Sequence, residues 1–448
     1  MRKQSLAALD GRHFDAVIVG GGINGAGVAR DAALRGLSVC LFEKADYASG
    51  TSSKSTKIAH GGLRYLKHFE FGLVFESQQE RHILGKLLKH LITPQAFCYP
   101  VYRGDPDPLW LVRLGVAVYD LLATFRNVER QRYLPPATAL AANPGLRPEG
   151  LQGAVRYFDD RMDDARIVLE NVLSAEDAGA SCLNYTEVLD IEREGGGYRV
   201  RYREVFGPTE GSVTCAAVVN CGGPWGDAVA AAAGIGAKRL APTKGVHIVV
   251  PRLPLADALI LPTGPDDRVF FVIPWGEHSL IGTTDTKYDG DPDRAEVTSE
   301  DVDYLLESAR RYLPGQPLDQ ESISYAFAGL RPLVAPPRPD VPAGSISRRH
   351  HIFADPPAFI TLLGGKFTTY RKMAEETVDR LQSALGRRVT PSPTRKAAFF
   401  RESYANTPVM VDRLALYRAM QAFYGPRAGF VMDYLLAYPD SGLRAVET

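Results

Sequence analysis

Apolar stretches interrupted by glycine give the clearest pattern near the start of the chain. Residues 16–19 are apolar without a break, which is typical of a strand buried on both faces of a parallel sheet. A helix is expected over residues 23–35, Gly36 ends it, and residues 37–43 form a second strand. The pattern therefore predicts a βαβ unit over residues 14–43.

The rest of the chain shows further elements of both kinds. A helix that begins at Asp163 or Asp164 has a carboxylate where it can cap the first turn. Residues 94–108 are rich in proline, and residues 386–398 are expected to form a linker. The short strands between residues 240 and 350 predict a mixed β-rich insert. Helices are expected at 76–91, 109–125, 164–179, 299–313, 368–385, 409–424 and 426–437, and strands at 188–191, 198–202, 216–220, 247–250, 269–273, 279–282 and 359–363.

Five residues in and after the first turn have the types and spacing of a dinucleotide-binding site. Gly20 allows a tight turn, Gly22 lets a pyrophosphate approach bare backbone, and Gly25 lets the helix pack close to the strand. The first turn of the helix, which contains Asn24, points its amides at the phosphates. Glu43 follows about 20 residues later, where a carboxylate can accept hydrogen bonds from both ribose hydroxyls. This spacing predicts a Rossmann-like layer that binds an ADP-containing dinucleotide.

Two other places repeat this arrangement of a strand and a glycine-rich turn. Such turns follow predicted strands at residues 20–25, 221–224 and 364–365. Ligands of open α/β sheets collect beyond the carboxyl ends of the strands, so all three turns are expected to face the same cofactor. Residues 46–62 form a polar loop that is longer than a simple connection, and we expect it to be functional.

Composition narrows the class of protein without choosing its chemistry. The 448 residues are 45% hydrophobic and 23% charged, as in an ordinary globular protein of two or three domains. Lys+Arg and Asp+Glu balance at 52 each, which gives no indication of a nucleic-acid partner. The five scattered cysteines predict reduced structural thiols, and no cluster has metal-ligand spacing. The apolar tract at residues 109–125 is shorter than a membrane span, which leaves a packed helix or a membrane-surface helix.

A series of motifs resembles one flavoprotein family. A serine-rich loop at residues 51–57 precedes the sequence HGGLRYL at residues 60–66, a combination typical of FAD-dependent glycerol-3-phosphate dehydrogenases of the aerobic type. The resemblance covers roughly residues 13–380 in order. Further motifs of that family stand at residues 163–166, 220–225, 244–250, 274–275, 282–285, 329–333 and 364–371.

The resemblance implies an α/β fold. A Rossmann-like FAD-binding domain of the glutathione-reductase/glycine-oxidase type would be joined to a mixed β-rich substrate domain and a short C-terminal helical segment, and FAD would be held without a covalent bond. Family members carry a longer all-helical cap, so the cap is shortened here or the chain is truncated. The expected segments are 13–90, 156–240 and 351–385 for the FAD-binding domain, 91–155 (helical and β) and 241–350 (β-rich) for the substrate domain, and 386–448 for the cap.

The implied reaction is oxidation of sn-glycerol 3-phosphate to dihydroxyacetone phosphate, with a hydride passing to flavin N5 and electrons passing on to a quinone. In the family, Arg64 and Tyr65 lie at the substrate phosphate, which a guanidinium can hold through two parallel hydrogen bonds. Arg331 lies over the substrate, toward the reacting carbon. Lys366 and Thr368 are expected to bind substrate and to stabilise the anionic reduced flavin.

Two histidines are candidates for the base that takes the hydroxyl proton. His247 lies inside an apolar strand and is the first choice, although a core histidine that bonds only to backbone has the same pattern. His60 adjoins the flavin loop and is the second candidate, while Asp285 is compatible with a simple turn cap. FAD contacts are expected from Gly20, Gly22, Asn24, Gly25, Glu43, Ser52, Ser53, Thr56, His60, Gly61, Gly365, Lys366 and Thr368.

Two alternatives are weighed against this interpretation. An oxidase of the same fold would use oxygen, acting on glycerol 3-phosphate, an amine or a 2-hydroxy acid, and the motifs do not choose between oxygen and quinone. A nucleic-acid-binding flavoprotein needs a basic face, which a net charge of zero disfavours. The protein is expected to be cytoplasmic or peripheral on the cytoplasmic face of the inner membrane, and the sequence leaves a homodimer open.

Overall fold

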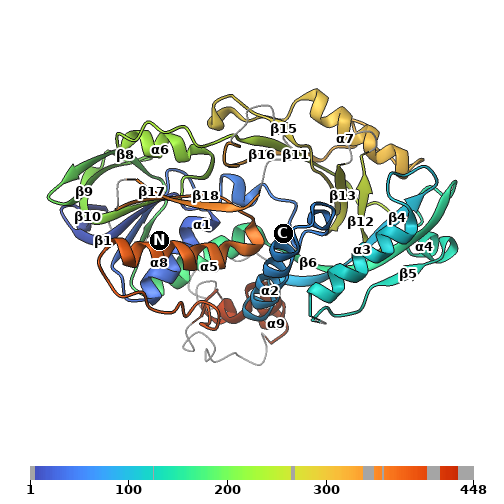
Figure 1. Cartoon of the computed structure of the whole chain (residues 1–448), viewed down its shortest axis with the longest axis horizontal. Coiled ribbons are helices and arrows are strands. Elements are labelled where there is room, and N and C mark those ends of the chain that lie inside the picture. Colours follow the sequence, from blue (N-terminus) through green and yellow to red (C-terminus); the bar gives the residue numbers. More distant parts are fainter. Residues whose placement is uncertain are drawn as a thin grey trace.

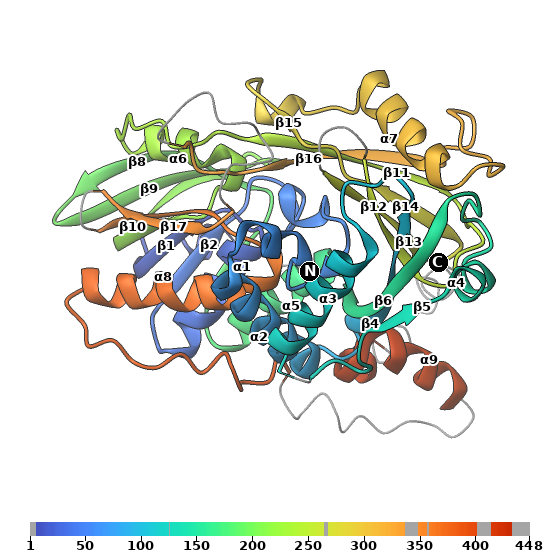
Figure 2. The same ribbon diagram turned by 45° about the vertical axis from the view of Figure 1, so that its right-hand side comes forward.

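The computed structural model shows two β-sheets side by side along an elongated body, with helices against their faces (Figure 1). It describes residues 6–124, 126–263, 268–336, 348–355, 358–400 and 414–431. In the turned view, α7 (Ser299–Tyr312) lies along the upper edge of the molecule and α9 (Leu414–Tyr424) lies at its lower edge (Figure 2).

The first sheet contains the βαβ unit predicted at the start of the chain. Its strands in the described ranges are β1 (His13–Val19), β2 (Val39–Phe42), β7 (Ser181–Leu183), β8 (Thr186–Glu194), β9 (Gly197–Glu204), β10 (Glu210–Asn220), β17 (His350–Ala354) and β18 (Phe359–Gly364). The centre is parallel, in the order β7–β2–β1–β10–β18, while β17 and the hairpin β8–β9 are antiparallel additions. Every strand predicted for this sheet is present, and the α/β fold class is confirmed.

Three helices cover one face of this sheet (Figure 1): α1 (Ile23–Leu34), α5 (Asp164–Asp177) and α8 (Tyr370–Ala384). The alanines and glycines of α1 let the other two helices approach closely. At Gly27, for example, a Cβ would lie 2.9 Å from the Tyr370 ring. The N-terminus of α5 is capped by Asp163, whose side chain accepts a hydrogen bond from the Arg166 amide at 3.1 Å, which confirms one of the two predicted caps.

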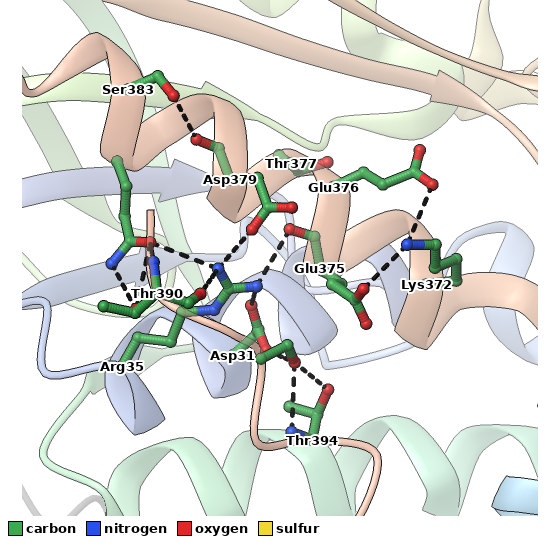
Figure 3. Close-up of polar contacts among 12 residues, drawn as sticks. Asp31, Arg35, Lys372, Glu375, Glu376, Thr377, Asp379, Ser383, Thr390 and Thr394 are labelled. Carbon is green, nitrogen blue, oxygen red and sulfur yellow. Dashed lines mark hydrogen bonds and ion pairs between the residues drawn. The ribbon is translucent and has the colours of Figure 1, made fainter. Parts of the chain in front are cut away.

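A polar network joins α1 to α8 and to the segment that follows α8 (Figure 3). Arg35, at the end of α1, pairs with Asp31 at 2.6 Å and with Asp379 at 2.5 Å. The same guanidinium donates to the Thr390 carbonyl at 2.7 Å. Because Arg35 is almost fully buried, these partners replace its hydration. The segment 386–398, expected to be a linker, is therefore held against α1 and α8 by Arg35.

The second sheet contains the β-rich insert predicted between residues 240 and 350, together with four strands from earlier in the chain. Its described strands are β3 (Ile58–Ala59), β4 (Ile92–Tyr102), β5 (Arg132–Leu134), β6 (Leu151–Met162), β11 (Thr243–Pro251), β12 (Ala258–Pro262), β13 (Val269–Trp275), β14 (His278–Gly282), β15 (Thr286–Lys287) and β16 (Tyr325–Arg331). They run in the order β15–β11–β14–β13–β12–β4–β6–β3, with β16 beside β11 and β5 beside β6. The predicted helix at residues 299–313 is confirmed as α7, which a Thr298–Asp301 capping box begins.

The sequence did not indicate the two long strands β4 and β6. β4 includes Pro94 and Pro100, which cannot donate to a neighbouring strand. β12 pairs with β4 only at Phe97 and Cys98, so both prolines lie outside the part of β4 that pairs on two sides. β6 pairs with β4 along its length and crosses the boundary expected between residues 155 and 156.

The remaining helices lie around and between the sheets. The prediction of a helix at residues 76–91 was wrong at both ends, because α2 begins at Phe71 and ends at Leu87. Of the two helices expected after residue 408, α9 is present from Leu414, and residues 409–413 and 432–437 lie outside the described ranges. The other helices of the described ranges are α2 (Phe71–Leu87), α3 (Leu109–Leu122), α4 (Pro136–Ala142) and α6 (Gly226–Ala232). The 3-10 turns are η1 (Leu6–Ala8), η2 (Thr51–Ser53), η3 (Leu63–His68), η4 (Gly223–Trp225), η5 (Pro292–Arg294), η7 (Phe367–Thr369) and η10 (Gly425–Arg427).

The structure bears on three features considered from the sequence: the state of the cysteines, a membrane-spanning helix and a metal site. All five cysteines are buried and free, as predicted. Within the described ranges, no helix is long and apolar enough to cross a membrane. The same residues contain no group of three or more His, Cys, Asp or Glu side chains that could hold a metal ion.

Candidate active site

A cavity of about 810 Å³ lies where the carboxyl ends of the parallel strands face the second sheet. Cofactor and small-molecule sites typically measure roughly 300–1,000 Å³, so this cavity is large enough for a dinucleotide. Its lining includes residues at the ends of β1, β2, β10 and β18, together with residues of β11 and β16. The three glycine-rich turns, at residues 20–25, 221–224 and 364–365, all contribute to this lining, so one ligand can contact them together.

The glycines of the first turn leave space that side chains would fill. At Gly20, φ is +108° and a Cβ would lie 2.5 Å from the Cys221 carbonyl oxygen. At Gly25, a Cβ would lie 1.8 Å from the Gly20 carbonyl oxygen, so packing of α1 on β1 requires this glycine. Gly22 lines the cavity, and the nearest atom to a Cβ there would be Ser52 Oγ, at 3.1 Å. The turn is therefore a cradle of bare backbone at the N-terminus of α1.

Glu43 lies just after β2, on the wall of the same cavity. Its carboxylate accepts hydrogen bonds from the Gly21 amide at 2.6 Å and from the Ala45 amide at 2.8 Å. Burial raises the pKa of this carboxyl group, and the two backbone hydrogen bonds oppose the rise. Because a carboxylate has more acceptor sites than these two amides use, Glu43 is held in one orientation with capacity left for ribose hydroxyls.

Most of the predicted cofactor contacts line this cavity, and three of them do not. Ser52 Oγ accepts a hydrogen bond from the Ile23 amide at 2.9 Å, which joins the serine-rich loop to the start of α1. The predicted contacts on the lining are Gly20, Gly22, Asn24, Glu43, Ser52, Thr56, His60, Gly365, Lys366 and Thr368. The predicted contacts that do not line it are Gly25, Ser53 and Gly61.

A smaller cavity, of about 70 Å³, adjoins the first and is lined by four arginines. They are Arg64, Arg268, Arg331 and Arg348. Arg331 and Arg348, together with His60 and Tyr65, line both cavities, so the two spaces share a wall. Burial lowers the pKa of Arg331 to about 10, which still leaves it charged at neutral pH. Such a concentration of positive charge suits a dianion.

The sequence singled out some of these cations and missed others. Arg64, Tyr65 and Arg331, the residues that the resemblance assigns to the substrate, lie together at the smaller cavity. Neither Arg268 nor Arg348 was expected there, because each stands in a polar stretch without a motif.

One carboxylate connects two of the arginines. Asp285 Oδ1 accepts a hydrogen bond from Arg331 Nη1, and Oδ2 accepts one from Arg348 Nη2, both at 3.1 Å. Burial alone would raise the pKa of Asp285, but the two arginines hold it below its usual range. The side chain of Asp285 therefore faces the cationic cavity.

Lys366 and Thr368, which lie just before α8, both line the larger cavity. Lys366 Nζ lies 3.7 Å from the centre of the Tyr65 ring and donates to Ser77 Oγ at 3.3 Å. Burial is the main cause that lowers the pKa of Lys366 to about 7. Thr368 Oγ1 accepts a hydrogen bond from the His60 amide at 3.2 Å, which joins the HGGLRYL segment to η7, just before α8.

The two candidate bases occupy different positions. His247, on β11, stacks on Phe327 with 5.0 Å between ring centres, and its Nε2 lies 3.0 Å from Thr56 Oγ1. It lines the larger cavity only, and its Nδ1 is buried without a hydrogen bond to any described residue. His60 lines both cavities. Burial lowers the pKa of each histidine to about 3, so both imidazoles are neutral near pH 7.

A buried network that no sequence pattern indicated supports the HGGLRYL segment. The Gly61 amide donates to the Tyr119 hydroxyl at 2.7 Å, and that hydroxyl lies 2.8 Å from Asp159 Oδ1. Arg81 Nη1 donates to the same carboxylate oxygen at 2.6 Å. Burial raises the pKa of Asp159 to about 7, although Arg81 opposes the rise. These side chains come from α2, α3 and β6, so their spacing in the sequence carries no signal.

The sequence of this chain matches one family of flavin-dependent enzymes. The sequence profile of the family described as FAD dependent oxidoreductase matches residues 15–371. The chain belongs to this family. The glycerol-3-phosphate dehydrogenase of Synechocystis sp. is 36% identical to this oxidoreductase over 97% of the chain and 83% of the relative. The protein of the same name from Mycobacterium leprae is also 36% identical, over 95% of the chain and 74% of the relative.

Solved structures give the same result for this FAD-dependent oxidoreductase. The glycerol-3-phosphate dehydrogenase from Bacillus halodurans, complexed with FAD, matches with a TM-score of 0.76 and 30% identity, over 99% of this chain and 81% of that chain. Glycine oxidase from Geobacillus kaustophilus, at 20% identity and a TM-score of 0.62, shares the fold. The expected family, the glycine-oxidase type of fold and the requirement for FAD are therefore confirmed. The backbone cradle and the volume of the larger cavity fit such a dinucleotide.

Proposed function

We propose that this oxidoreductase converts sn-glycerol 3-phosphate to dihydroxyacetone phosphate. The observation that carries the proposal is the arginine-lined cavity that shares a wall with the dinucleotide cavity, because a dianionic phosphate is best bound by several guanidinium groups. The names of the Synechocystis sp. and Mycobacterium leprae relatives support the same substrate. A cationic amine substrate is disfavoured, since the four arginines would repel it.

The cradle residues would hold FAD without a covalent bond. The bare backbone at Gly22 and the first amides of α1 suit the pyrophosphate, and the carboxylate of Glu43 suits the ribose. When bound, FAD supplies the hydride acceptor of the reaction.

The arginines would bind the phosphate group and orient the alcohol. Arg64 binds at the phosphate end, because it lines the smaller cavity only. Tyr65 and Arg331 line both spaces and extend from that end toward the larger cavity. A bound phosphate would thereby direct the carbon chain of the substrate toward the larger cavity. Alcohols without a phosphate would lose these contacts and bind weakly.

Of the two candidate bases, the geometry favours His60. It lies on the wall shared by both cavities, where the substrate carbon would pass, and its imidazole is neutral near pH 7. His247 lies on the larger cavity only, with its Nε2 directed at Thr56. We therefore assign the acceptance of the hydroxyl proton to His60 and the orientation of Thr56 to His247.

Replacing Lys366 with methionine is expected to lower the two-electron midpoint potential of bound FAD by about 30–60 mV, since a nearby cation favours the electron-rich state. The lysine is charged below its pKa of about 7 and loses its charge as the pH rises. The difference from the wild type should therefore be larger near pH 6 than near pH 9. A redox titration followed by flavin absorbance measures this potential.

A matched lysine provides the control for this measurement. Lys372, on α8, lines neither cavity and pairs with Glu375 at 2.9 Å. Lys372→Met should leave the potential unchanged. An unchanged potential in Lys366→Met would remove this lysine from the cofactor environment.

We propose a quinone as the electron acceptor, and oxygen is the alternative. The dehydrogenase names of the relatives support the first. The test is to reduce the FAD-loaded protein with glycerol 3-phosphate, identify dihydroxyacetone phosphate as the product, and then add a soluble quinone or air. Fast reoxidation by quinone and slow reoxidation by air support the dehydrogenase, whereas fast reoxidation by air with release of peroxide identifies an oxidase.

We also propose a peripheral position on a membrane surface, which an apolar face of α3 supports. Val112 and Tyr119 of this helix are buried, whereas Trp110 and Leu114 are 65% and 55% exposed. Trp110 and Leu114 are four residues apart and share one side of the helix, and the exposed Arg113 lies beside them. Apolar side chains beside an exposed cation are typical of helices that lie on anionic lipid.

Replacing Trp110 and Leu114 together with serine is expected to reduce binding to anionic lipid vesicles by at least about tenfold, because burying each such side chain contributes roughly 1.5–3 kcal/mol. Co-sedimentation measures the bound fraction. Phe206 is 81% exposed on the turn after β9, so Phe206→Ser is a matched control and should bind like the wild type. Equal sedimentation of the double variant and the wild type would contradict a role for α3.

A further inference from the structure

The last residue of β14 and the three that follow it, residues 282–285, form a segment that surrounds the guanidinium group of Arg331. Arg331 Nη2 donates to Thr283 Oγ1 at 3.0 Å and to the Thr284 carbonyl at 3.1 Å. Arg331 Nη1 donates to Asp285 Oδ1 at 3.1 Å. Acceptors on three consecutive residues therefore fix both the position and the plane of this guanidinium.

A glycine on a neighbouring strand leaves the space that the guanidinium of Arg331 occupies. Gly245 lies on β11, and a Cβ at this glycine would stand 2.4 Å from Arg331 Nη2. Only the absence of a side chain lets the guanidinium reach the acceptors of the 282–285 segment. The position of Arg331 thus depends on two separate strands of the second sheet.

Asp285 also reaches two further arginines of the smaller cavity. Its second carboxylate oxygen, Oδ2, accepts a hydrogen bond from Arg348 Nη2 at 3.1 Å. Its backbone carbonyl accepts one from Arg268 Nη1 at 3.1 Å. Asp285 is only 8% exposed, so these contacts are shielded from water. One residue therefore hydrogen-bonds with three of the four arginines that line the cavity.

Like charges held this closely in a buried site repel one another strongly. The carboxylate of Asp285 lies between Arg331 and Arg348 and binds each through a different oxygen. It offsets their repulsion and also prevents either guanidinium from turning away. The arginines are thus arranged before any substrate arrives, which lowers the ordering cost of binding.

We propose that Asp285 is a positioning residue, which holds Arg331 and Arg348 in place for a phosphate group and so determines selectivity for a phosphorylated alcohol. The inference rests on the proposed function for the identity of that alcohol. Asp285 acts through the arginines, because its own negative charge opposes an incoming phosphate.

Because the carboxylate repels phosphate, the direction of the change in phosphate affinity on removing it tests the positioning role. If only net charge mattered, removing the carboxylate would make the cavity more positive, and anions would bind more tightly. If Asp285 positions the arginines, removing it lets them separate, and anions bind more weakly.

Asp285→Asn keeps the shape of the side chain and removes its charge. In the FAD-loaded variant we expect the dissociation constant of inorganic phosphate, measured by calorimetry, to rise by at least about tenfold. KM for glycerol 3-phosphate should rise by a similar factor, while kcat at saturating substrate falls by less than about threefold. Unchanged or tighter binding of phosphate would overturn the proposal.

Asp301→Asn is the matched control. Asp301 is buried and pairs with Lys244 at 2.5 Å in the same domain, and it lines neither cavity. This variant should bind phosphate like the wild type. Wild-type protein that binds phosphate but is not reduced by glycerol 3-phosphate would contradict the proposed function, while the comparison of phosphate binding would still decide the role of Asp285.

A second variant covers the case in which Asp285→Asn does not fold. Thr283→Val removes one uncharged acceptor from Arg331 and retains the shape of the side chain. It should weaken phosphate binding by about three- to tenfold, as expected for one hydrogen bond to a charged group. Wild-type affinity in this variant would overturn the claim that the 282–285 segment positions Arg331.

Discussion

Replacing Arg64 with alanine should raise KM for glycerol 3-phosphate by about 100-fold, because removing one partner of a desolvated charge pair costs roughly 2–5 kcal/mol. Arg64 lines the smaller cavity and does not line the larger one, so the loss should affect the phosphate and leave FAD bound. Steady-state kinetics with a soluble quinone measures KM, and the flavin absorbance per protein measures cofactor content.

A different arginine separates this effect from a general loss of positive charge. Arg156 is partly buried on β6, pairs with Asp257 at 3.1 Å, and lines neither cavity. Arg156→Ala should therefore leave KM near the wild-type value. If Arg64→Ala retained the wild-type KM with a full complement of FAD, Arg64 would have no part in binding the phosphate.

Replacing His60 with asparagine should slow anaerobic flavin reduction by roughly 100- to 10,000-fold, the usual contribution of a positioned base. The wild-type imidazole has a pKa of about 3, so it is deprotonated throughout the neutral range and its contribution should not vary there. In the variant, hydroxide is the remaining base, so the residual rate should rise with pH. Stopped-flow absorbance of the flavin measures both rates.

His247→Asn is the matched variant for the other candidate base. Because His247 is directed at Thr56 and lines the larger cavity only, its loss should slow reduction by less than about tenfold. The reverse ranking, with His247→Asn the slower variant, would restore His247 as the base, acting at or through Thr56. The pair of variants therefore decides between the choice made from sequence and the choice made from geometry.

The parts of the site that are continuous in sequence could be inferred from local patterns. The cradle needs Gly20, Gly22 and Gly25 at fixed spacing, and Glu43 must end the next strand, so the local pattern is enough to place all four. The three glycine-rich turns were expected to meet because the carboxyl ends of parallel strands share one edge of a sheet. The lining of the larger cavity agrees with that expectation.

The parts that depend on tertiary contacts could not be predicted. Arg348 and Arg268 reach the smaller cavity from segments that carry no motif, and only the folded chain brings them to Asp285. The support of the HGGLRYL segment by Tyr119 and Asp159 crosses a helix and a strand far apart in the sequence. The role of Asp285 was left open from the sequence, where a simple turn cap fitted as well, because its arginine partners lie 46 and 63 positions away.

The choice between His247 and His60 also depended on tertiary contacts. An apolar strand containing His247 predicts burial correctly, and burial alone does not show which cavity the imidazole faces. The strand β4 was missed because two prolines outweighed its apolar residues, and its pairing pattern becomes visible only beside β6 and β12. Both cases needed the neighbouring strands to resolve a pattern that was locally ambiguous.

The most direct test is to add glycerol 3-phosphate, without oxygen, to pure protein loaded with FAD. The two cavities that share a wall imply that the yellow flavin absorbance will disappear after about one substrate per flavin. Dihydroxyacetone phosphate should appear in the same amount, and glycerol at equal concentration should cause little change. Flavin that remains bound and oxidised in excess glycerol 3-phosphate would contradict the account.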